Sequence, residues 1–116
     1  TAVAIPDSVT ELGDSAFKYC SALKSATLPA RITEIGSDLF SDCSALKSVI
    51  IPDGVTTVYA FAFYNCTSLE SVFIPDSVVN MGGNEFPGCD KLTIHCGANS
   101  FAASYAAQHN IPFVTE

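Results

Sequence analysis

Five cysteines are the residues of this chain best suited to bind a metal, form disulfides or act as nucleophiles. Four of them recur every 23 residues and the fifth follows seven residues later, at Cys20, Cys43, Cys66, Cys89 and Cys96. Thiolate metal sites need close pairs such as Cys-x-x-Cys, and this spacing offers none. Even spacing predicts one cysteine per stacked unit, about 5 Å from the next. That distance permits disulfides, but it favours buried thiols that pack as small apolar groups. The thiol or disulfide state is left open, and no metal or other cofactor is expected.

The histidines and acids lack the partners that catalysis requires. A nucleophilic site needs Cys or Ser beside a base and an orienting acid. His95 adjoins Cys96, but neighbours on a strand point to opposite faces, and His109 falls in a terminal segment. The evenly spaced acids predict turn capping, because no dense calcium-loop run surrounds them; they are Asp7, Asp53 and Asp76. No catalytic residue is assigned, and the chain is not expected to be an enzyme.

All of these residues are placed by a 23-residue repeat. Four positions keep one residue type in all four copies: Pro at 6, 29, 52 and 75, Phe at 17, 40, 63 and 86, Cys at 20, 43, 66 and 89, and Leu at 23, 46, 69 and 92. One such unit cannot enclose a core, whereas stacked units turn each position into a continuous ladder of like side chains. The repeat therefore predicts a solenoid. Around Ala16-Phe17 and Ala62-Phe63, on its convex side, we expect irregular or single-turn helical pieces.

One strand per unit is predicted between the Leu position and the next Ile-Pro or Leu-Pro. Leu46-x-x-Val49-x-Ile51 and its counterparts have the L-x-x-L-x-L spacing of a leucine-rich repeat, whose strands line the concave side. Alternation sends the last two apolar residues of each segment inward. It sends six residues outward, and these are the candidate partner-binding residues: Ser25, Thr27, Ser48, Ile50, Ser71 and Phe73. An exposed Ile50–Phe73 pair is unusual without a role, although curvature or another domain can shield such a pair.

The ends of the chain differ from the four repeats. Residues 1–4 match the tail of a repeat, so the chain begins within a repeat and further repeats are expected upstream. Residues 5–96 hold the four units, and residues 97–116 form a C-terminal cap in one domain of 1–116. In this cap, residues 101–106 have helical spacing. Asn99 or Ser100 can serve as the N-cap, Asn110 suits the left-handed position at the helix end, and Phe113-Val114 reads as a last strand.

Composition narrows the classes of partner. Hydrophobic residues make up 48% of the 116, and the formal net charge is −7. An acidic chain is a poor ligand for nucleic acid. No apolar run approaches the roughly 20 residues that a membrane helix needs. Neither nucleic acid nor direct membrane insertion is expected.

The repeat resembles the BspA-type leucine-rich repeat of bacterial and protozoan surface proteins. The matching pattern is IP-D-x-V-T-x-I-G-x-x-A-F-x-x-C-x-x-L-x-S-V, over residues 1–96. The resemblance implies an α/β-type repeat solenoid, a right-handed coil with a parallel β-sheet on its concave face, a mostly irregular convex side and a helix-strand cap. It also implies an extracellular or cell-surface location, and adhesion to host or matrix proteins or to surface glycans. The alternative is a structural spacer that displays another domain. The oligomeric state is left open.

Overall fold

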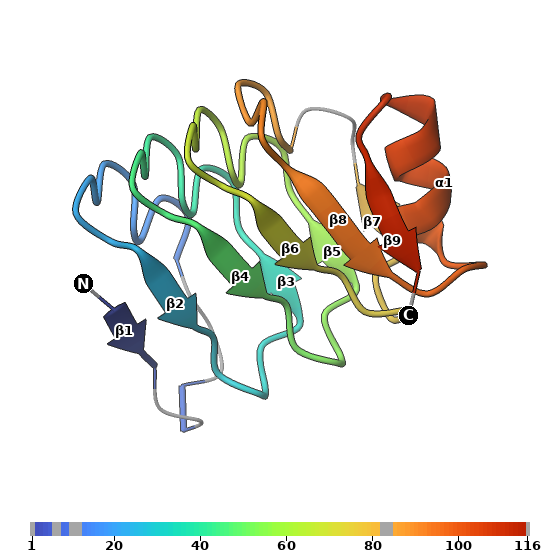
Figure 1. Cartoon of the computed structure of the whole chain (residues 1–116). Coiled ribbons are helices and arrows are strands. Elements are labelled where there is room, and N and C mark those ends of the chain that lie inside the picture. Colours follow the sequence, from blue (N-terminus) through green and yellow to red (C-terminus); the bar gives the residue numbers. More distant parts are fainter. Residues whose placement is uncertain (1, 6–7, 10–12, 82–84, 116) are drawn as a thin grey trace.

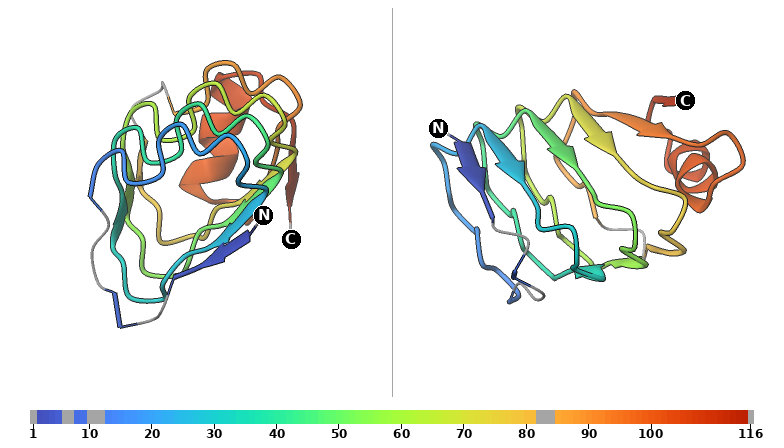
Figure 2. Two further views of the ribbon diagram at one scale, coloured as in Figure 1. Left: turned by 90° about the vertical axis from the view of Figure 1, so that its left-hand side faces the viewer. Right: turned by 90° about the horizontal axis from the view of Figure 1, so that it is seen from below.

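The chain forms a coil whose turns stack side by side in the computed structural model (Figure 1). The structure describes residues 2–5, 8–9, 13–81 and 85–115. Within the repeat, Pro6, Asp7 and the positions at 82–83 lie outside these residues. The N-terminal strand and the C-terminal helix lie at opposite ends of the stack (Figure 2). The predicted solenoid architecture is confirmed.

The main sheet has one strand from each turn of the coil. Its six parallel strands are ordered β1 (Ala2–Ala4), β2 (Ser25–Thr27), β4 (Ser48–Ile50), β6 (Ser71–Phe73), β8 (Thr93–Cys96) and β9 (Phe113–Thr115). Partners in β2, β4 and β6 are separated by 23 residues, as in Ala26↔Val49↔Val72. The two predicted apolar positions point inward, since Val49 and Ile51 are buried and Ile50 between them is exposed.

A second sheet lies on the opposite side of the coil, where the sequence predicted irregular or single-turn helical pieces. It contains β3 (Glu34–Ile35), β5 (Thr57–Val58) and β7 (Asn80–Met81), all parallel. Two-residue segments repeat at the strand spacing, so each satisfies backbone groups of the next. The segments around Ala16-Phe17 and Ala62-Phe63 are turns, and the expectation of helical pieces there is wrong. Left-handed residues flank both pairs and interrupt helical geometry; they are Ser15, Tyr19, Phe61 and Asn65.

A ladder of stacked phenylalanines fills the interior beside the turns. Phe17, Phe40, Phe63 and Phe86 lie with ring centroids 5.5, 5.5 and 5.2 Å apart, and with interplanar angles of 8°, 16° and 11°. Phe40 and Phe63 are fully buried, whereas Phe17 at the end of the ladder is half-buried. Repetition at the coil spacing thus places like rings face to face.

The cysteine ladder lies beside the phenylalanines as free thiols. Each thiol donates to the carbonyl oxygen of the Phe in the preceding repeat: Cys43 to Phe17, Cys66 to Phe40 and Cys89 to Phe63, all at 3.0 Å. Cysteine therefore fits this position because it is small, apolar and able to donate a weak hydrogen bond. Burial raises the pKa of the Cys43 thiol to about 11.

A helix and a strand close the C-terminal end of the coil (Figure 1). Helix α1 (Phe101–Gln108) begins at Ser100, whose hydroxyl accepts from the Ala103 N–H at 3.1 Å, and Asn110 adopts the left-handed conformation with φ 57°. The predicted N-cap and helix end are thereby confirmed. Tyr105 packs edge-on against Phe86, at 6.2 Å between centroids, and so ends the aromatic ladder.

Glu85 is the polar exception in the core. It is fully buried and accepts a 2.8 Å hydrogen bond from the Tyr105 hydroxyl. The equivalent positions in the earlier repeats are Ala16, Leu39 and Ala62. Burial and the bond to Glu85 raise the pKa of Tyr105. A carboxyl group is accommodated at this one position because the cap supplies its partner.

Candidate functional site

The outer face of the main sheet carries the six residues that the sequence singled out. Strand register aligns them in two rows across β2, β4 and β6. One row is Ser25–Ser48–Ser71, continued by Thr93, and the other is Thr27–Ile50–Phe73, continued by His95. The first row is small and polar, whereas the second changes from polar to apolar and back to polar along the coil.

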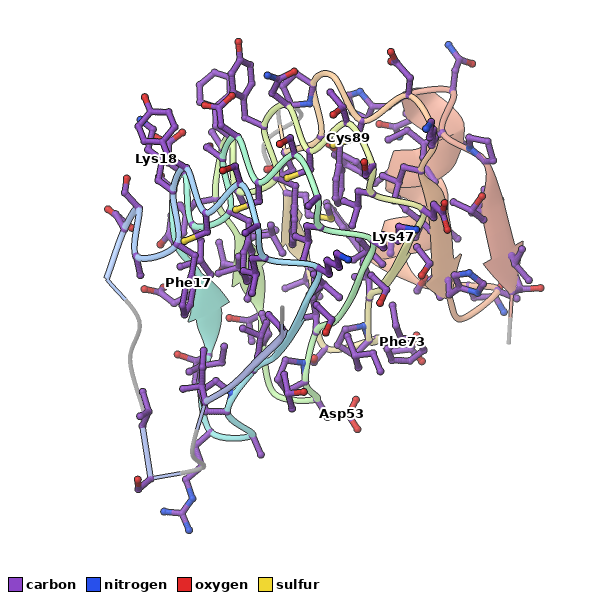
Figure 3. The ribbon with its side chains drawn as sticks, turned by 60° about the vertical axis from the view of Figure 1, so that its left-hand side comes forward. Phe17, Lys18, Lys47, Asp53, Phe73 and Cys89 are labelled. Atoms are coloured by element: carbon purple, nitrogen blue, oxygen red, sulfur yellow. The ribbon has the colours of Figure 1, made fainter. Side chains whose placement is uncertain are left out.

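Ile50 and Phe73 are direct neighbours in this second row but differ in exposure. Ile50 is 69% exposed, the highest value among the large hydrophobic side chains of the described residues. Phe73 is half-buried. Both lie on the sheet side of the molecule, as does Lys47, whereas Phe17 lies in the interior (Figure 3). The pair therefore forms an apolar surface that solvent reaches mainly at Ile50.

Two hollows adjoin this face at the ends of the strands. One has a volume of about 310 Å³ and is lined by Ser25, Thr27, Ser48 and Ile50 together with the turn that follows β2. The other, of about 330 Å³, lies between Phe73 and the acidic turns that contain Asp53 and Asp76. Ile50 and Phe73 thus border different hollows, and the candidate surface has an uncharged end and an acidic end.

The residues that could have supported catalysis are kept apart. His95 is half-buried on the outer face, whereas Cys96 beside it is fully buried on the inner face. His109 lies at the helix C-terminus, with its ring 4.3 Å from that of Tyr105. Across the described parts of the chain, no three His, Cys, Asp or Glu side chains gather as a metal site would require.

The sequence reasoning missed a group of aromatic residues on the turns. Tyr19, Phe61 and Tyr64 are each at least 40% exposed. They share a hollow of about 290 Å³ with Lys18, Asp38 and Asp42. The available signal was that aromatic residues occur beside the Phe and Cys positions in the first and third repeats only, where the second repeat has acids.

A coil of parallel strands with one apolar ladder per repeat position defines a leucine-rich-repeat solenoid. The family model for the BspA type leucine rich repeat region matches residues 1–109 in six copies. The chain belongs to the BspA-type leucine-rich-repeat family. No curated protein matches the chain.

Solved structures of bacterial leucine-rich-repeat proteins are similar to this chain. A leucine rich cell surface protein from Faecalibacterium prausnitzii is 36% identical, with a TM-score of 0.82 over 90% of this chain and 28% of that one. The T. pallidum leucine rich repeat protein is 25% identical, with a TM-score of 0.64 over 81% of this chain and 57% of that one. A Bacteroides ovatus leucine-rich repeat protein, 24% identical with a TM-score of 0.51, shares the fold over 83% of this chain and 37% of that one. The chain spans less than two thirds of each of these proteins.

The only helix among the described residues is α1, which has eight residues. Nowhere in the described ranges is there a helix with the length and apolar character needed to cross a bilayer.

Proposed function

We propose that the chain is a non-enzymatic binding module of a cell-surface or secreted protein, and that the outer face of its main sheet contacts a protein or a glycan. The observation that carries this proposal is the exposed Ile50, aligned with Phe73 on a sheet face otherwise lined by Ser and Thr. Apolar side chains surrounded by small polar ones are typical of contact surfaces.

Two further observations support a surface role. The similar F. prausnitzii protein is described as a cell surface protein. The solenoid also offers an extended face rather than an enclosed pocket, which suits a macromolecular partner better than a small substrate. Matrix proteins, other host proteins and surface glycans are the partner classes that fit. Catalysis has no support from the placement of the Cys and His side chains described above.

A spacer that displays another domain is the second candidate. It is favoured by the short span of the chain relative to the F. prausnitzii protein, of which it matches 28%. It is also favoured by the Ser and Thr residues that occupy most of the outer face.

One binding experiment separates the two functions. The purified chain is applied to an array of matrix proteins, mucins and glycans, beside the double variant Ile50→Ser plus Phe73→Ser. Ser48→Ala, at a neighbouring outward position, is the matched control. A saturable signal that the control keeps and the double variant loses supports the binding module. Equal signals from the double variant and the wild type refute a role for this face, and no signal at any probe favours the spacer.

A further inference from the structure

A second surface, separate from the sheet, lies on the rim where the turns of successive repeats meet. The hollow there, of about 290 Å³, is lined by Lys18, Tyr19, Asp38, Asp42, Phe61 and Tyr64. We call these six residues the rim pocket. Lys18 lies at this rim, outside the phenylalanine ladder that begins with Phe17 (Figure 3). Ligand pockets start at about 300 Å³, so the rim pocket has room for one side chain rather than a large ligand.

The walls of the rim pocket are held by hydrogen bonds between successive turns. The Tyr19 N–H donates to the Ser41 carbonyl oxygen at 2.9 Å, and the Asp42 N–H donates to that of Tyr64 at 2.8 Å. The buried Ser41 hydroxyl lies 2.7 Å from Asp38 Oδ1 and 2.7 Å from the Phe61 carbonyl oxygen. The pocket is therefore supported from behind by the packed coil and does not depend on mobile side chains alone.

Tyr19 and Phe61 occupy backbone positions that disfavour aromatic residues. Both are left-handed, with φ of 65° and 61°. At the Tyr19 position the later repeats have Asp42, Asn65 and Gly88, and at the Phe61 position the earlier ones have Ser15 and Asp38, all with positive φ. Asp, Asn and Gly tolerate this conformation, whereas bulky residues are outliers there. Because the backbone does not select these two rings and they stay exposed, their side chains are retained for something outside the coil.

The chemistry of the rim pocket suits a cation. The faces of Tyr and Phe rings attract Lys and Arg side chains, and two carboxylates line the same hollow. The protein already shows this contact internally, since Lys18 Nζ lies 5.1 Å from the centre of the Tyr19 ring. The net charge of −7 adds a general attraction for basic partners.

We propose that the rim pocket binds an arginine side chain presented by a basic segment of a partner protein. A planar guanidinium can stack on an aromatic face and still donate two hydrogen bonds to a carboxylate. Lys18 competes for the same ring, so it weakens the binding of an external cation. This site is independent of the sheet face, because the two surfaces share no residue.

The first test is a titration of the ¹⁵N-labelled chain with the peptide Gly-Ser-Gly-Arg-Gly-Ser-Gly, followed by amide chemical shifts. The matched probe carries citrulline, which has the shape of arginine without its charge. We expect saturable shifts that cluster on the rim pocket with the arginine peptide and weaken as salt is added. Shifts of equal size with the citrulline peptide, or none at millimolar arginine peptide, overturn the proposal. Neutral sugars that shift the same amides while the arginine peptide does not would assign the pocket to glycans instead.

Variants then distinguish a binding role from a structural one. Tyr19→Asn and Phe61→Asn place a residue suited to the left-handed backbone, and each should keep the fold and weaken arginine binding by about two- to fivefold. Asp38→Asn plus Asp42→Asn should weaken it further, and Lys18→Met should strengthen it. Unchanged affinity in all of these variants contradicts the proposal. Ile50→Ser plus Phe73→Ser should bind the peptide normally, so failure at the sheet face and failure at the rim are told apart.

Discussion

The phenylalanine ladder and the left-handed turn positions are both repeated features, but they constrain the sequence differently. The ladder keeps the same residue in every repeat because its rings stack 5.2–5.5 Å apart in a closed interior. The turn positions keep the same backbone, with φ near 60° at Tyr19, Asp42 and Asn65, yet each has a different side chain. Inward positions therefore fix side-chain identity, whereas outward positions fix only conformation and leave the side chain free for recognition.

Removing one ring from the ladder should have the largest effect. Phe40→Ala or Phe63→Ala leaves a cavity between two stacked neighbours, and we expect a loss of about 3–5 kcal/mol in unfolding free energy. Urea denaturation followed by circular dichroism measures this loss. Phe17→Ala is the control, since Phe17 is half-buried and should lose less. Equal losses at Phe17 and Phe40 would contradict the distinction between interior and edge.

The buried Glu85–Tyr105 pair should show the next largest effect. Tyr105→Phe removes the 2.8 Å donor to Glu85, and we expect a loss of about 1–3 kcal/mol because a buried acceptor loses its partner. Adding Glu85→Ala, the residue found at Ala16 and Ala62, should restore part of that loss. A double-mutant cycle by thermal unfolding measures the coupling, and additive losses would show that the hydrogen bond contributes nothing.

The buried thiols should make stability fall at alkaline pH. The pKa of Cys43 is about 11 in the folded chain, above the ordinary thiol value of 9.0. Below pH 9 the thiol is protonated in both states, so its contribution is complete. Between pH 9 and 11 the unfolded chain ionises first, and stability is lost as pH rises. Cys43→Ser keeps a donor to Phe17 without this titration, so urea midpoints from pH 8 to 10.5 should fall less steeply in the variant than in the wild type.

Replacing an aromatic residue at a left-handed position should have the smallest effect, and it can be opposite in sign. Phe61→Asn relieves an unfavourable conformation but gives up the edge-on contact with Tyr64, whose ring centre is 5.6 Å away. We expect the unfolding free energy to change by less than about 1 kcal/mol. Thermal unfolding measures it, with Asn65→Ala as the control that should destabilise. A large loss in Phe61→Asn would mean that this ring belongs to the core.

Much of the fold could be predicted from the repeat because register follows directly from spacing. The Phe, Leu and strand positions each recur at 23 residues, so their alignment in the stack needs no further information. The same spacing assigned Ser48, Ile50 and Phe73 to the outer face. The second sheet was missed because its strands have only two residues, too few for alternation to be recognised.

The sequence by itself determined the coil, the inward ladders and the capping helix, because each depends on contacts between identical positions or on local backbone preferences. Only the tertiary structure decided that Glu85 meets Tyr105, 20 residues away, and that Tyr19 and Phe61 share one hollow across two repeats. These contacts join unlike positions of the repeat. Their geometry depends on how far neighbouring turns are offset, and a periodic pattern does not carry that distance.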